Sequence, residues 1–200
     1  MSLWGKSPDA VDNKPKHLND AEKRDAYATN SGWTVPAGGN GNPAADREVL
    51  VAIRGLAGTS ATTGLREATI TDVRFVIGST ATTDLTAGGG ASITAEITWD
   101  EAVTIAGGNP TMTIANGNES TDGNGNYVLA YTSVGSTANR KIFTLSGQTL
   151  SAADVLSLGT ALHDSVVLPG GVTIKDTASG TVNSKRSIAA SVRTTHTVVA

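Results

Sequence analysis

The sequence predicts an all-β protein, a β-sandwich preceded by an extended N-terminal arm with one short helix. Short runs of alternating apolar and polar residues recur at roughly 8–12-residue spacing, which is typical of sandwiches. Glycine accounts for 23 of the 200 residues. Together with abundant threonine, this composition suits short strands joined by many turns. Aromatic residues make up only 4% of the chain, so Val, Ile, Leu and Ala must supply most of the core.

We expect residues 1–45 to be mostly irregular. They hold four of the six prolines and a run of glycine and asparagine at residues 38–42. One short helix is predicted at residues 19–28, where Asn19 can cap the first turn and Glu22 completes a capping box. A helix of this length is marginal alone and needs a surface to pack against.

The chain divides into two parts by this interpretation. Residues 1–84 form a docking arm, in which residues 48–53 and 69–77 alternate as a small pair of strands. A low-complexity linker or long loop follows at 79–90. Residues 85–200 form the sandwich.

The strands of the sandwich follow from the same alternation. Ile93, Ala95, Ile97 and Trp99 should face inward. One helical turn is expected at residues 151–156. The predicted strands are 93–99, 111–115, 127–132, 141–146, 166–168, 172–175 and a long last strand at 187–199.

Residues 93–117, ITAEITWDEAVTIAGGNPTMTIANG, resemble the opening of a bacterial-type immunoglobulin-like repeat. Residues 131–145 and 168–176 continue the pattern of that family in order, although the family's closing Asn is absent near Gly180. The resemblance implies an immunoglobulin-like β-sandwich. Such repeats occur in bacterial surface adhesins and in virion proteins of tailed phages, usually in tandem, whereas this chain has one.

The N-terminal part is similar to small virion proteins of contractile-tailed phages of marine cyanobacteria. The similarity lies in residues 3–6 (LWGK), 13–18 (NKPKHL), 27–33 (YATNSGW) and 48–53 (EVLVAI). It implies a head decoration or cement protein, or a neck accessory protein, located in the virion after assembly in the host cytoplasm. The arm would then dock on the capsid scaffold. The alternative is an adhesin module that binds a host-surface glycan, although glycan sites generally use exposed aromatic residues.

Five residues are candidates for docking on a partner. Trp4 and Trp33 could be anchors buried in a neighbouring subunit, because Trp supplies a large contact area. Alternatively, both fold back on the chain's own sheet. Val49, Val51 and Ile53 alternate along one predicted strand and complete the set.

Charge limits the classes of partner. The net charge is -3, so the chain lacks the overall basic field that nucleic-acid binding favours. No Lys or Arg lies between Phe75 and Asn139, whereas Lys185, Arg186 and Arg193 lie near the C-terminus. This separation could pair one copy with another, or it is an ordinary solvated surface. The expected partners are the major capsid or other virion proteins and further copies of the chain.

Neither membrane attachment nor secretion is expected. No run approaches the roughly 20 apolar residues of a membrane span. The start of the chain also lacks the apolar stretch of a signal peptide. The sequence therefore predicts no membrane partner.

None of the sequence motifs that could indicate a catalytic, metal-binding or nucleotide-binding site is complete. The chain has no cysteine, which excludes thiolate sites. Residues 122–126 resemble a calcium loop, but Tyr127 and Ser133 occupy the positions that need Gly and Glu. Residues 163–165 are His-Asp-Ser, and consecutive side chains cannot form a catalytic relay. Residues 38–42 lack the Lys of a phosphate loop. We expect no catalytic residue, no metal ion and no cofactor.

Overall fold

The computed structural model describes residues 18–36, 45–52, 59–60, 63–64, 67–77, 80–81, 85–117, 125–152 and 154–200. Strands dominate these residues, which confirms the predicted all-β class. Within this part of the chain, no helix has the length and apolar character that crossing a membrane requires.

The described elements are one α-helix, one short 3-10 helix and sixteen strands. Helix α1 spans Asp20–Asp25 and the 3-10 helix η2 spans Ala190–Val192. The strands are β1 (Tyr27–Thr29), β2 (Gly32–Val35), β3 (Glu48–Val51), β4 (Thr59–Ser60), β5 (Thr63–Gly64), β6 (Ile70–Ile77), β7 (Thr80–Ala81), β8 (Leu85–Thr86), β9 (Gly88–Trp99), β10 (Val103–Ala106), β11 (Thr111–Asn116), β12 (Tyr127–Thr132), β13 (Arg140–Leu150), β14 (Val155–Leu158), β15 (Thr173–Asp176) and β16 (Thr194–Val199).

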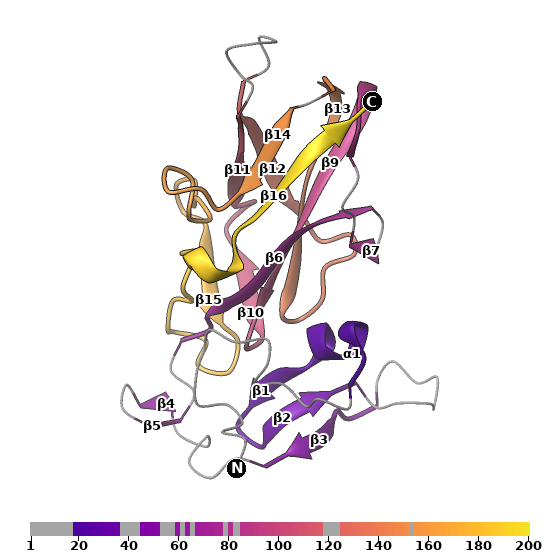
Figure 1. The fold of residues 1–200 in the computed structure, drawn as a ribbon. Coiled ribbons are helices and arrows are strands. Elements are labelled where there is room, and N and C mark those ends of the chain that lie inside the picture. The colour runs from indigo at the N-terminus through magenta and orange to yellow at the C-terminus, as the bar shows by residue number, and fades with distance from the viewer. Residues whose placement is uncertain are drawn as a thin grey trace.

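The main element is a nine-stranded sheet in the order β7-β6-β9-β13-β12-β11-β14-β16-β8. Its neighbouring strands are antiparallel except for the parallel pair β16–β8. The sheet curls strongly (Figure 1), so that β6 and β16 approach each other although five strands separate them in the sheet. The rings of Phe75 on β6 and His196 on β16 lie 5.0 Å apart in an edge-to-face arrangement. Three smaller sheets are formed by β1-β2-β3, β10-β15 and β4-β5.

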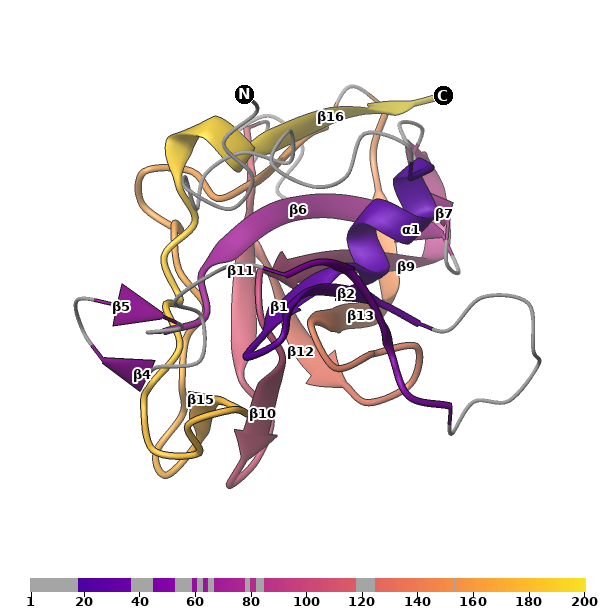
Figure 2. The same cartoon turned by 90° about the horizontal axis from the view of Figure 1, so that it is seen from below.

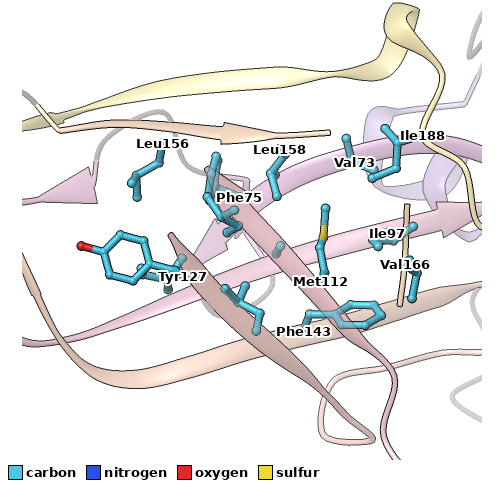
Figure 3. Close-up of a cluster of buried hydrophobic side chains, with 14 of the residues drawn as sticks. Val73, Phe75, Ile97, Met112, Tyr127, Phe143, Leu156, Leu158, Val166 and Ile188 are labelled. Atoms are coloured by element: carbon cyan, nitrogen blue, oxygen red, sulfur yellow. The ribbon is translucent and has the colours of Figure 1, made fainter. Parts of the chain in front are cut away.

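The curled sheet encloses the core on its concave face. Ile93, Ala95, Ile97 and Trp99 on β9 are all fully buried, as the alternation predicts. Figure 3 shows side chains from β6, β9 and β11 to β14 meeting in this core. The buried indole N–H of Trp99 has a hydrogen-bond partner, because it donates to the backbone oxygen of Lys185 at 3.0 Å.

Helix α1 confirms the predicted cap. The Asn19 side chain accepts from the Glu22 backbone N–H at 2.9 Å, and the Glu22 carboxylate accepts from the Asn19 N–H at 2.8 Å. The helix is shorter than predicted, because Ala26 is already extended and leads into β1.

The expectation that the first 45 residues are irregular apart from one helix is wrong for residues 27–35. They contain β1 and β2. The expected pairing of residues 48–53 with 69–77 is also wrong. Instead β3 pairs with β2, and β6 pairs with β9. The nine-stranded sheet therefore begins before residue 85, where the sequence placed the start of the sandwich.

The predicted linker at 79–90 contains strand residues. Leu85 is buried on β8, which pairs with β16 from the far end of the chain. Gly88, the first residue of β9, pairs with Leu150 of β13. Both pairings depend on distant segments, so local composition cannot reveal them.

Three predictions for the C-terminal part are corrected. The last residues of the helical turn expected at 151–156 belong instead to strand β14. This strand lies between β11 and β16, and its Leu156 and Leu158 are buried in the core. Residues 166–168 form only one isolated bridge, between Val167 and Thr111. The long last strand at 187–199 is interrupted by η2, and only its second part forms β16.

Candidate docking surface

The N-terminal unit, which we define as α1 with β1, β2 and β3, lies at one end of the nine-stranded sheet (Figure 1). Its three strands are antiparallel, with Ala28 opposite Trp33 and Trp33 opposite Val51. Gly32 has a φ of 124°, and a Cβ atom there would lie 2.0 Å from the Val51 carbonyl oxygen. Only glycine allows β2 to approach the end of β3 this closely.

Arg47 holds the start of β3 against the rest of the unit. Its guanidinium donates to the Thr34 hydroxyl at 2.9 Å and to the Asp25 carbonyl oxygen at 2.6 Å. It also lies over the ring of Tyr27, 3.9 Å from the ring centroid, in a cation–π contact. Burial lowers the pKa of Arg47 from its usual value. One side chain thus joins α1, β1, β2 and β3.

An ionic cluster around Glu96 fastens the unit to the nine-stranded sheet. Glu96 lies on β9 and is only 2% exposed. Its carboxylate contacts Arg74 of β6, lies 3.0 Å from Arg140 of β13 and lies 3.8 Å from Arg24 of α1. Arg140 also pairs with Asp25 of α1 at 2.7 Å. Burial raises the pKa of Glu96, and the surrounding arginines oppose this rise.

Backbone hydrogen bonds join the unit to the main sheet next to this cluster. The Ala28 N–H donates to the Asp100 carbonyl oxygen at 2.7 Å. The Asn139 side-chain amide donates to the Arg24 carbonyl oxygen at 3.0 Å and to the Trp99 carbonyl oxygen at 3.2 Å. Charged and main-chain contacts therefore attach the N-terminal unit to its own chain.

Two buried carboxyl groups lie beside this joint. Glu101 forms an isolated bridge with Ala28 and is only 5% exposed, and Asp176 is fully buried. Burial, together with the nearby carboxylates of Asp100 and Asp176, raises the pKa of Glu101 to about 8. Glu101 therefore carries its proton at neutral pH, which avoids two adjacent buried negative charges.

Strand β3 is the outer strand of the N-terminal unit. It comes last in the order β1-β2-β3, so within the described ranges one of its edges has no neighbouring strand. Figure 1 shows β3 on the side of the unit that faces away from the nine-stranded sheet. Val49 on this strand is 50% exposed, and Val51 is half-buried. The geometry thus leaves an open strand edge with an exposed apolar side chain on a firmly held support.

The five docking candidates end up in different places. Val49 and Val51 lie on β3. Trp33 is only 7% exposed and lies within β2, so it packs into its own chain and is not on the surface of the folded unit. Trp4 and Ile53 lie outside the described residues. The sequence interpretation missed Glu96 and Arg47, whose partners come from distant segments; the one local signal was a glutamate in the middle of an alternating strand.

Comparison with protein-family models, with curated proteins and with solved structures finds no match to this chain. Within the described ranges, no group of three or more His, Asp and Glu side chains could hold a metal ion.

Proposed function

We propose that this chain is a non-enzymatic structural protein of a virus particle, with an immunoglobulin-like β-sandwich as its body. Its role is that of a head decoration or cement protein, or of a neck accessory protein, that docks on the capsid scaffold. The two resemblances in the sequence support this role. The structural observation that carries it is the edge of β3, which has no neighbouring strand among the described residues, with Val49 half exposed.

An open strand edge is a binding surface by its chemistry. Its backbone N–H and C=O groups can pair with an extended segment of a partner, and exposed side chains on alternate positions supply selectivity. Val49 supplies the apolar contact, and the neighbouring Glu48 is exposed and charged. Gly32 and Arg47 hold this strand in place, which lowers the ordering cost of binding.

One such edge gives a small contact, so the strength of attachment comes from repetition. Many copies on one symmetric particle can each bind weakly and still be retained, since binding of linked copies is multivalent. The proposed partners are the major capsid or other virion proteins, together with further copies of this chain.

The direct test is the protein content of purified particles of the virus that encodes the chain. Quantitative mass spectrometry should find the chain at a fixed ratio to the capsid protein. A ratio that follows the symmetry of the shell would indicate decoration, and a much lower ratio would indicate the neck. Its absence from washed, infectious particles would refute the structural role.

The role of β3 is tested by Val49→Lys, which places a charge in the proposed contact. Val49 is half exposed, so the substitution should change folding stability by less than about 0.5 kcal/mol. We expect at least about a tenfold loss of binding to particles that lack the chain, equivalent to about 1.4 kcal/mol. A cosedimentation titration measures this loss.

Val128→Lys is the matched control. Val128 is 52% exposed and lies on β12, a strand with neighbours on both sides. This variant should bind the particles like the parent chain. Equal effects of the two substitutions would show that β3 is not the docking edge.

A further inference from the structure

A pocket of about 510 Å³ lies at the flank of the molecule beside β15. Its walls come from residues 165–174 and 183–187, with Glu67 at one side. Figure 2 shows β15 and the gold segments next to it on the side of the molecule opposite α1. The volume falls within the roughly 300–1,000 Å³ that small-molecule sites occupy.

The wall formed by residues 183–187 is held by bonds to three other segments. The Ser184 N–H donates to the Ile174 carbonyl oxygen of β15 at 3.0 Å, and the Lys185 N–H donates to the Ala68 carbonyl oxygen at 2.8 Å. The Lys185 carbonyl oxygen accepts from the Trp99 indole N–H at 3.0 Å. The pocket is therefore largely preformed, as ligand sites usually are.

The lining combines an apolar part with groups that bond to hydroxyls. Leu168 provides accessible aliphatic surface, and the buried side chains of Val172 and Ile174 lie behind it. The Ser184 hydroxyl is buried and has no hydrogen-bond partner among the described residues. Its oxygen has almost no accessible surface, so hydrogen bonds to a ligand must come from the other polar residues of the lining. The remaining polar lining residues are Ser165, Thr173, Asn183 and Ser187.

The charged groups of the lining are two cations and one carboxylate. The Lys185 ammonium lies 3.4 Å from the Glu67 carboxylate, and both side chains are exposed. The Arg186 guanidinium donates to the Val166 carbonyl oxygen at 3.0 Å. The described lining thus carries one positive charge in excess.

We propose that this pocket binds a single sugar residue that carries a carboxylate, such as a uronic acid. The C–H face of a sugar ring fits against Leu168, while its hydroxyls can both donate and accept toward Ser165, Ser187 and Asn183. The sugar carboxylate is placed at Arg186. A purely apolar ligand would leave the hydroxyls and charges unpaired, and a divalent cation would need more carboxylates than Glu67 alone.

An NMR titration of the full-length chain with methyl β-D-glucuronide tests the proposal. Amide shifts should change at residues 165–168, 172–174 and 183–187 and fit a dissociation constant of about 1 mM, which corresponds to about −4 kcal/mol. Methyl β-D-glucoside, which lacks the carboxylate, should bind at least about tenfold more weakly. Equal binding of the two would refute the role of the carboxylate.

Three variants localise the site. Arg186→Gln should weaken glucuronide binding about tenfold, because it removes the cation that faces the carboxylate. Ser165→Ala, which removes a half-buried hydroxyl of the lining, should weaken it less. Ser187→Trp fills the pocket from an exposed position and should abolish the shifts. Lys23→Gln on α1 is the charge-matched control and should bind like the parent chain.

Two outcomes would overturn the proposal. The first is the absence of shifts at these residues at about 10 mM glucuronide, ten times the expected dissociation constant. The second is binding that persists in Ser187→Trp, which would place the sugar elsewhere. The site is separate from β3, so a negative result here leaves the docking test with Val49→Lys unaffected.

Discussion

Glu101 and Lys141 are buried ionisable side chains whose pKa values meet near 8 from opposite directions. Burial and the adjacent carboxylates raise the pKa of Glu101 from 4.5 to about 8. Burial lowers the pKa of Lys141 from 10.5 to about 8, and its ammonium group donates to the Thr137 carbonyl oxygen at 2.6 Å. Each group therefore changes charge in the folded chain at a pH where the unfolded chain does not.

This pair predicts a minimum of stability near pH 8. Between pH 4.5 and 8 the folded chain keeps a proton on Glu101 that the unfolded chain has lost, so stability falls as pH rises. Between pH 8 and 10.5 the unfolded chain keeps a proton on Lys141 that the folded chain has lost, so stability rises with pH. The raised pKa of Glu96 adds to the fall on the acidic side. Urea denaturation at closely spaced pH values measures the curve.

Two substitutions separate the contributions of Glu101 and Lys141 to the pH dependence of stability. Glu101→Gln should reduce the fall below pH 8, because it removes the proton that the folded state retains. Lys141→Met should flatten the rise above pH 8. A stability that is constant between pH 6 and 10 in the parent chain would contradict the expected windows of Glu101 and Lys141.

At the scale of elements, α1 is a short helix that depends on its charged contacts with the main sheet. It has six residues, too few to be stable alone. Arg24 and Asp25 on the helix join the cluster around Glu96, and Arg140 links the two carboxylates. The buried Glu96, which contacts three arginines, thus contributes to the attachment of the N-terminal unit together with the hydrogen bonds of Ala28 and Asn139.

Removing the carboxylate at this position should be strongly destabilising. Glu96→Ala leaves guanidinium groups without their buried counter-charge, and we expect a loss of about 3–5 kcal/mol in urea denaturation. Hydrogen exchange of the amides in α1, β1 and β2 should rise more than that in β12. A comparable loss in the two regions would show that the cluster stabilises the whole sheet and is not specific to the attachment.

Glu67→Ala is the control for this prediction. Glu67 pairs with Lys185 through exposed side chains at 3.4 Å. Exposed ion pairs contribute at most about 1 kcal/mol, so the control should change stability little. Equal losses for Glu67→Ala and Glu96→Ala would contradict the importance of burial at Glu96.

At the scale of the whole molecule, the curl of the nine-stranded sheet closes the core. Phe75 is fully buried on β6 and meets His196 of β16 at 5.0 Å. These strands lie near opposite ends of the sheet order, so their contact joins the two ends across the core. Folding of the N-terminal and C-terminal halves should therefore be cooperative.

Truncation of Phe75 tests this closure. Phe75→Ala should cost about 3–5 kcal/mol, whereas Phe75→Leu, which keeps most of the volume, should cost less. The ring protons of His196 should shift in both variants, because they lose the edge-to-face neighbour. Unfolding monitored by His196 and by Trp fluorescence should remain coincident. Unchanged His196 signals would show that the two strands do not meet in solution.

Alternation along single strands was the most informative part of the sequence. It placed Ile93, Ala95, Ile97 and Trp99 inward, and all four are buried. The capping box at Asn19 was equally readable, because both of its partners lie within one turn. The strands β2, β8, β10 and β14 were missed, and their residues acquire strand structure through pairing with distant segments. Strand β1 was also missed, although its partner β2 follows it directly in the chain.

For the candidate docking residues, too, the local sequence does not decide which side chains are exposed. Val49 and Trp33 are both apolar residues in segments that read as part of one arm. Their exposure differs: Trp33 lies on the middle strand β2 and is 7% exposed, whereas β3 comes last in its sheet and Val49 is 50% exposed. Exposure depends on what covers a side chain, and the covering residues lie elsewhere in the chain.

The class of the fold, the inward positions of β9 and the start of α1 were already present in the amino-acid pattern, because two-residue alternation and capping act between near neighbours. The strand order, the curl that brings β6 to β16, the shared burial of Glu96 and the open edge of β3 arose only when distant segments met. Pairing energies of that kind depend on both partners, and no single stretch of the chain contains both.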